Sequence, residues 1–117
     1  MTDAPIVRQH HATFEELRQM DNDGNEFWLA RPLAKVLDYS EYRHFLPVIQ
    51  RAREACAKSR QSVADHFEDI LEMVDIGSGA RRQLPDIRLS RYACYLIVQN
   101  GDPSKTVIAN GQTYFAM

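Results

Sequence analysis

The sequence predicts an α+β fold, a mainly helical domain with a central buried helix and one small antiparallel β-hairpin. The central helix is indicated near residues 90–100, because almost every side chain from Tyr92 to Val98 is apolar or aromatic. The surrounding short helices are indicated by apolar side chains that recur on one helical face only. The hairpin is indicated by a glycine-containing turn in residues 77–82 that precedes a strand-like segment.

Composition places the chain among ordinary globular proteins. Of its 117 residues 44% are hydrophobic and 26% are charged, which excludes a disordered tail, a collagen-like chain and a coiled-coil rod. The longest apolar stretch is far shorter than a membrane span, and the N-terminus shows no secretory pattern. Cys56 and Cys94 lie in apolar helical patterns, so we expect reduced core residues in a cytoplasmic protein.

The first third of the chain predicts a helix followed by a short strand. Residues 1–11 are polar, and we expect a flexible lead-in there. Thr13 is suited to cap a short helix that begins at Phe14, and the turn-forming residues 21–25 end it. Residues 27–29 then favour an extended strand.

Two further helices are expected in the middle of the chain. The first begins near Pro32, because proline is well suited to an opening turn. The second is capped by Ser40 and continues with helical spacing to Cys56. Pro47 predicts either a kink or a new helix beginning near Leu46, because proline removes a backbone hydrogen bond and clashes with the preceding turn.

The predicted hairpin is centred on its glycines. Residues 63–76 suit either a helix or a strand, whereas residues 84–89 alternate as a strand does. We expect residues 77–82, which include Arg81 and Arg82, to form the tip.

The last part of the chain predicts two helices. Ser90 caps the central one, and Asp102 with Pro103 starts the final one. The chain stops inside the apolar pattern of that final helix. We therefore expect residues 12–117 to be a single domain and the front part of a longer protein.

Charge is unevenly distributed along the chain. The formal net charge of −2 does not favour nucleic-acid binding, which usually goes with a basic domain. Residues 1–30 are mainly acidic, and residues 65–75 carry acidic charges only. The basic stretches 43–60 and 81–91 oppose them. Each block by itself is most simply a solvated face, so DNA binding requires the basic stretches to lie together.

Motifs for catalysis and for metal or cofactor binding are lacking. The histidines share no ligand spacing with each other or with the cysteines, and no Gly-x-Ser-x-Gly or complete phosphate-loop motif occurs. The acidic residues of 65–75 resemble those of a metal-dependent nuclease, but the lysine that such a site uses is absent there. We predict a protein without cofactor, metal or enzymatic activity.

The hairpin tip is the strongest local candidate for phosphate contact. Gly77 and Gly79 precede Arg81 and Arg82, and arginine forks match phosphate oxygens. A solvated turn without such a role is the alternative. The aromatic side chains best placed to stack on bases are Tyr39 and Tyr42.

Four segments carry a family resemblance. Residues 89–105 (LSRYACYLIVQNGDPSK) and 111–116 (GQTYFA), with 27–31 (FWLAR) and 73–80 (MVDIGSGA), resemble the DNA-damage-inducible protein D family. Members of that family are longer, and this part is similar to the Bro-N domains of viral and phage proteins, which are regarded as DNA-binding. The resemblance implies a module of the bacterial SOS response. One departure is Asp38, where the family pattern has glycine, and aspartate tolerates a left-handed backbone.

These observations predict a non-catalytic, DNA-associated module that contacts the phosphates of single- or double-stranded DNA with little sequence preference. The alternative is a protein-interaction module that regulates a DNA-bound recombinase, through acidic residues 65–75 or the apolar end near Tyr114 and Phe115. The open helix end at Met117 also allows two copies to pair artificially in a truncated chain. DNA binding requires the arginines of residues 81–88 and Lys105 to form one continuous positive surface. The predicted DNA contacts are Arg81, Arg82, Arg88, Arg91, Lys105 and Arg43.

Overall fold

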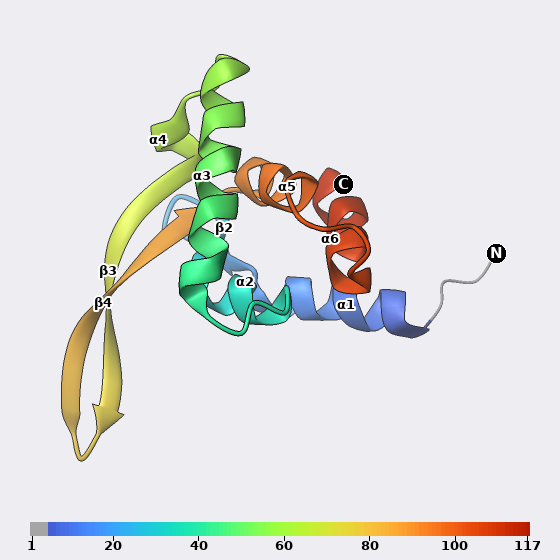
Figure 1. Ribbon diagram of the computed structural model, residues 1–117. Helices are drawn as coiled ribbons and strands as arrows, with labels where there is room; N and C mark the ends of the chain where they lie inside the picture. Colours follow the sequence, from blue (N-terminus) through green and yellow to red (C-terminus); the bar gives the residue numbers. More distant parts are fainter. Residues whose placement is uncertain (1–4) are drawn as a thin grey trace.

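The computed structural model describes residues 5–117, which form helices on one side and a sheet with a long hairpin on the other (Figure 1). The helices are α1 (Pro5–Leu17), α2 (Ala30–Val36), α3 (Tyr42–Lys58), α4 (Val63–His66), α5 (Arg91–Gln99) and α6 (Thr106–Ala116). The strands are β1 (Gln19–Met20), β2 (Glu26–Leu29), β3 (Phe67–Gly77) and β4 (Ala80–Leu89).

The sheet is antiparallel throughout, with the strand order β1-β2-β4-β3. Strand β2 pairs with β4 only at Arg88 and Leu89, at the end of β4. Beyond that point β3 and β4 continue as a two-stranded ribbon that extends away from the helices (Figure 1). The ribbon therefore has an open edge on both sides over most of its length.

Helix α5 lies at the centre of the helical part and packs against α3 and α6. Its residues Ala93, Cys94 and Val98 are completely buried. The hydroxyl of Ser90 caps the helix by accepting a hydrogen bond from the Ala93 N–H at 3.0 Å. These features confirm the α+β fold and the buried central helix. Both cysteines of the chain are buried and free, as expected.

An aromatic cluster joins α1, β2 and α6. The cluster consists of Phe14, Trp28, Tyr114 and Phe115. The ring centroids of its contacting pairs are 4.9–6.3 Å apart. Trp28 is fully buried, and its indole Nε1 donates a 2.8 Å hydrogen bond to the Phe14 carbonyl. Aromatic rings packed edge-on in this way contribute stability beyond the area they bury.

Helix α1 begins at Pro5, not at Phe14, so the described part of the predicted lead-in is helical. Residues 1–4 of that lead-in lie outside the described residues. Thr13 is inside the helix and bonds the Gln9 carbonyl at 2.8 Å. Packing on α6, which includes a 2.7 Å contact between His10 and Asn110, orders the polar segment. Tertiary contact with α6 thus makes residues 5–11 helical, although their polar sequence does not predict a helix.

Two more helix starts differ from expectation. Helix α3 begins after Glu41, without a side-chain cap from Ser40, and runs unbroken through Pro47. Pro47 is exposed, so water can bond the carbonyl that loses its helical partner. Helix α6 begins at Thr106, because Asp102 instead holds a turn by accepting hydrogen bonds from Ser104.

The ambiguous residues 63–76 divide into a short helix and a long strand, α4 and most of β3. The hairpin turn is tighter than predicted, because Gly77, Ser78 and Gly79 all take positive φ angles of 52–97°. Arg81 and Arg82 therefore lie in strand β4, next to the tip and not within it. Asp38 takes the left-handed backbone anticipated for it, with φ at 67°.

Candidate nucleic-acid interface

Arg81 and Arg82 lie one after the other near the end of the ribbon, so their side chains point to opposite faces. Arg81 stands opposite Asp75, and its Nε lies 3.5 Å from the carboxylate Oδ1. Arg82 stands opposite Val74 and has no ion pair among the described residues. Arg82 is thus the predicted contact whose charge is least compensated.

Arg88 lies at the base of the ribbon and is partly compensated. Its Nη1 is 3.7 Å from Oε1 of Glu68, the residue opposite it on β3. Its guanidinium lies over the ring of Phe27, at 4.8 Å from the centroid. Its Nε is buried and lacks a hydrogen-bond partner among the described residues.

Arg91 is held inside the fold by Glu26. Its Nε and Nη2 donate to the two carboxylate oxygens at 2.8 and 3.1 Å, and its Nη1 donates to the Tyr114 carbonyl. The hydrogen bond from Arg91 lowers the pKa of Glu26 to about 2, and the same bond raises the pKa of Arg91. The charge of Arg91 is therefore neutralised in the folded domain.

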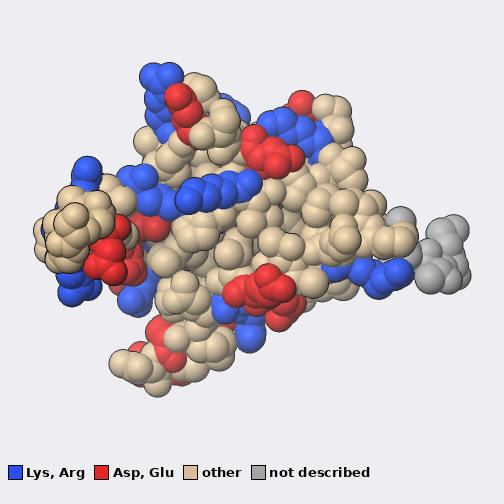
Figure 2. All heavy atoms as spheres, turned by 90° about the horizontal axis from the view of Figure 1, so that it is seen from below, with Lys and Arg blue, Asp and Glu red and all other residues tan. Residues whose placement is uncertain are grey.

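Lys105 and Arg43 lie outside the ribbon strands, at the starts of α6 and α3. Lys105 precedes α6, and its Nζ lies 5.1 Å from the centroid of the Tyr39 ring. Arg43 is the second residue of α3, and its Nε donates to Oε2 of Glu41 at 2.5 Å. Acidic side chains thus stand beside four of the six predicted contacts. Figure 2 shows basic and acidic side chains intermixed over one face, the hairpin included.

Tyr39 and Tyr42, the predicted stacking residues, already have cationic neighbours. The Arg31 guanidinium lies 4.2 Å above the ring of Tyr42, and Lys105 lies over Tyr39. Both tyrosines are half-buried against Phe45. Burial raises the pKa of each phenol.

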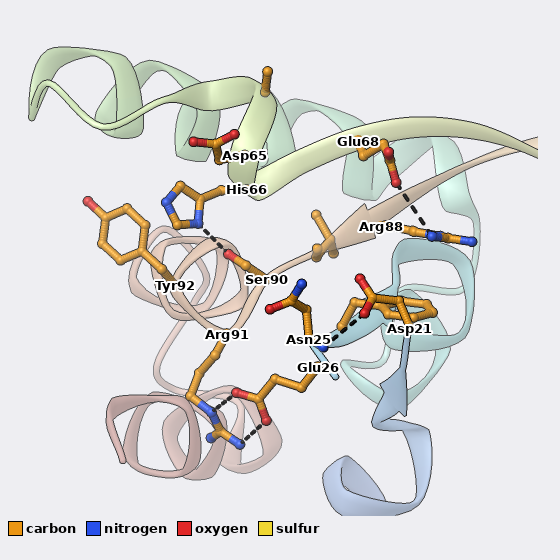
Figure 3. Close-up of a pocket in the computed structure, with 13 residues that line it drawn as sticks. Asp21, Asn25, Glu26, Asp65, His66, Glu68, Arg88, Ser90, Arg91 and Tyr92 are labelled. Atoms are coloured by element: carbon orange, nitrogen blue, oxygen red, sulfur yellow. Dashed lines mark hydrogen bonds and ion pairs between the residues drawn. The ribbon is translucent and has the colours of Figure 1, made fainter. Parts of the chain in front are cut away.

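A pocket of about 590 Å³ lies between the β1–β2 turn, α4 and the start of α5 (Figure 3). Two of its lining residues, His66 and Ser90, are joined by a 2.6 Å hydrogen bond between His66 Nδ1 and the Ser90 hydroxyl. Arg88 and Arg91 line it, but four carboxylates do too, so it does not suit a phosphate. The carboxylates belong to Asp21, Glu26, Asp65 and Glu68. Sequence reasoning missed this pocket, because three separate segments form it.

The described residues contain no group of three or more His, Cys, Asp or Glu side chains placed to hold a metal ion. Across residues 5–117, the helices are all too short or too polar to cross a membrane.

Comparison with known proteins identifies the family. The profile of the BRO family, N-terminal domain, matches residues 16–116. The chain belongs to this Bro-N family. It is also 61% identical over 111 residues to DNA damage-inducible protein D of Escherichia coli (strain K12), which confirms the resemblance seen in the motifs. That alignment covers 95% of this chain and 40% of the relative, so the chain spans about two fifths of the relative's length. No solved structure matches it.

Among the described residues, this Bro-N domain exposes apolar side chains both on the ribbon and at the end of α6, where Met117 is 77% exposed. Tyr114 and Phe115 are only 5% and 3% exposed, because α6 packs against α1 and α5. The two rings themselves are therefore largely covered, whereas Phe115, Ala116 and Met117 line a pocket with Tyr92 and Tyr95 at that end. Leu71, Met73 and Ile76 of β3 are exposed at 62%, 45% and 57%.

Proposed function

We propose that this Bro-N domain is a non-catalytic module of a bacterial DNA-damage response protein and that it associates with DNA in the cytoplasm. The name of its 61% identical relative, DNA damage-inducible protein D, supports the first part. The resemblance of its motifs to that family supports the second. Contact is mainly with phosphates of single- or double-stranded DNA, with little sequence preference.

The observation that carries the proposal is the projecting ribbon with Arg82 uncompensated near its tip. Strands in a sheet lie about 4.8 Å apart, and a two-stranded ribbon fits the major groove of about 12 Å. Arg81 and Arg82 face opposite sides and so reach phosphates on both walls. The turn residues 77–80 carry only small side chains, which permits close approach.

The other predicted contacts take a secondary part in this proposal. Arg88 and Arg43 contribute after their ion pairs with Glu68 and Glu41 loosen. Arg91 contributes little beyond its place in the fold, and Lys105 meets DNA only when the strand wraps around the domain. Two phosphate contacts give a slope of log affinity against log salt of about −1.8 on duplex DNA.

The test is binding of labelled single- and double-stranded DNA across a salt series. The Arg81→Ala/Arg82→Ala double variant is expected to lose most binding at low salt. The matched control is Lys35→Ala/Lys58→Ala, which removes the same charge at exposed positions outside the predicted contacts and leaves binding nearly unchanged. Equal losses in both variants would show general charge attraction, and no binding of the unmodified domain at low salt would exclude the proposal.

A second candidate function is regulation of a DNA-bound, recombinase-type protein by direct contact. The net charge of −2 and the exposed apolar side chains of β3 favour it. Its test is binding of this domain to a purified recombinase filament, and absence of binding would exclude it.

A further inference from the structure

Strand β3 is the outermost strand of the sheet, and its outer half carries a concentration of exposed apolar side chains. Leu71 and Met73 are neighbours on one face of the ribbon. Phe67 and Ile87 lie on the same face nearer the helices, where they are buried in the core. A soluble monomer rarely exposes several large apolar residues within one short strand unless a partner covers them.

The backbone of β3 also has unused hydrogen-bonding groups on its outer side. The Pro85 carbonyl accepts a 2.6 Å hydrogen bond from Arg31, which follows β2 and so lies on the side of β4 away from β3. Pro85 is paired with Leu71. Residues directly opposite in an antiparallel ladder point their N–H and C=O groups both inward or both outward. The groups of Leu71 therefore point outward.

The alternation of a strand extends this orientation to every second residue. We define the β3 edge as Asp69, Leu71, Met73 and Asp75, whose backbone groups all face away from β4. Among the described residues, no backbone group of another element bonds them. The bulge after Asp75 ends the edge.

The opposite edge of the ribbon is protected near its base, whereas the β3 edge is not. On β4, Pro85 offers no N–H, and the Arg31 amide bonds the Asp86 carboxylate at 3.1 Å, so the start of α2 covers this part of the β4 edge. Strand β3 contains neither proline nor lysine, the residues that usually prevent strand addition.

Charge indicates which strand the β3 edge accepts. Strand β3 carries acidic charges only, and the side chains of Asp69 and Asp75 remain 78% and 84% exposed despite their arginine partners. A second copy of β3 would bring these acids together, and like charges on paired strands are destabilising. We propose that the β3 edge binds, as an added strand, an extended segment of a partner protein with alternating basic and apolar side chains.

The β3 edge is a binding surface that the second candidate function would use. The inference rests on that function in one respect, because both require a protein partner. Contact of DNA with Arg81 and Arg82 does not depend on it. Strand addition supplies affinity through backbone hydrogen bonds and specificity through alternate side chains.

The test uses the 117-residue domain and two labelled nine-residue peptides. One alternates valine and lysine, and its counterpart alternates valine and glutamate. We expect the lysine peptide to bind, with slowed hydrogen exchange of the Leu71 and Met73 amides, and the glutamate peptide not to bind. Equal binding of both peptides, or no binding of either, would overturn the inference.

Two proline variants test which edge is used. Leu71→Pro removes one outward N–H from the β3 edge without breaking the ladder with β4, and about tenfold weaker binding is expected. Gln83→Pro removes an outward N–H from the other edge and leaves affinity unchanged. Should Leu71→Pro disturb the hairpin, Leu71→Lys/Met73→Lys keeps every backbone group and has the same expected effect. Weakening by Gln83→Pro equal to that by Leu71→Pro contradicts the inference.

Three other outcomes also count against it. A concentration-dependent dimer that Leu71→Pro abolishes would make a second copy the occupant. Protection of the Leu71 and Met73 amides by DNA would make DNA the occupant. Recombinase binding that persists in Leu71→Pro would overturn the β3 edge while the second candidate function stands.

Discussion

The guanidinium of Arg91 and the carboxylate of Glu26 form a two-point ion pair between residues 65 positions apart. The pair joins the first residue of α5 to the first residue of β2, and Arg91 also bonds the Tyr114 carbonyl of α6. One side chain thus ties together three elements at the base of the hairpin. Sequence analysis assigned Arg91 to DNA contact, whereas its geometry is that of a residue holding the fold.

The ion pair predicts a pH dependence of stability. The pKa of Glu26 falls from 4.5 to about 2 because Arg91 bonds its carboxylate. A depressed folded-state pKa stabilises the fold above the unfolded value, and that stability is lost as pH falls through the folded value. We expect a loss of about 1 kcal/mol between pH 4.5 and 2, after allowing for solvent screening. Urea unfolding at several pH values measures it.

Glu26→Gln should flatten that part of the profile. Glu54→Gln, at an exposed position of α3, is the control and should leave the profile unchanged. A Glu26→Gln profile parallel to that of the unmodified protein would contradict the assignment.

Trp28→Phe should destabilise the domain strongly. The Phe14 carbonyl depends on the Trp28 indole, because Arg18, its next helical donor, bonds the Glu15 carbonyl instead. The substitution leaves that carbonyl unpaired and opens a cavity, and we expect a loss of about 2–4 kcal/mol. Urea unfolding followed by far-ultraviolet circular dichroism measures it. Tyr95→Phe, at a half-buried position, should cost little, and equal losses would disprove the role of the indole.

Gly111→Ala should lower the melting temperature although alanine favours helices. A Cβ at this position would lie 3.0 Å from Val98 Cγ1 and 3.3 Å from Phe14 Cζ. Overpacking costs about 1–3 kcal/mol, against about 1 kcal/mol gained in helix propensity. We expect a net decrease of about 4–6 °C. Thr113→Ala, on the exposed face of α6, is the control and should not lower the melting temperature. A higher melting temperature for Gly111→Ala would contradict the prediction, because it would show that α1, α5 and α6 move apart easily to accept the methyl group.

Asp75→Asn should strengthen DNA binding if the ribbon tip is the contact. The substitution frees Arg81 from the carboxylate 3.5 Å away and removes one repulsive charge. We expect affinity to rise about two- to fivefold at low salt. The control is Glu54→Gln, which removes the same charge at an exposed position of α3 outside the predicted contacts. Equal gains would point to net charge alone, and no gain for Asp75→Asn would contradict contact at the tip.

Local signals in the sequence were sufficient for several elements. The apolar run after Ser90, the capping role of its hydroxyl, the glycines of the hairpin and the left-handed Asp38 all occur as expected. Each depends on residues within a few positions of one another, so backbone propensity and periodicity encode them directly.

Other elements depend on partners that are distant in the chain. Residues 5–11 became helical through packing on α6, and residues 67–77 became a strand because β4 pairs with them. The pocket around His66 and Ser90 likewise needs three segments to meet. The periodicity of a single segment does not show which distant segments it will contact in the folded chain.

The sequence by itself therefore determined the fold class, the buried helix, the hairpin and the family, because these follow from local pattern and from motif. Only the tertiary structure decided which charges are available. Strand register places Asp75 beside Arg81 and Glu68 beside Arg88, and the fold brings Glu26 to Arg91. The interaction between two charges depends on their distance in space, which the sequence does not give. Arg81, Arg88 and Arg91 of the basic stretch 81–91 therefore each form an ion pair, whereas Arg82 forms none among the described residues.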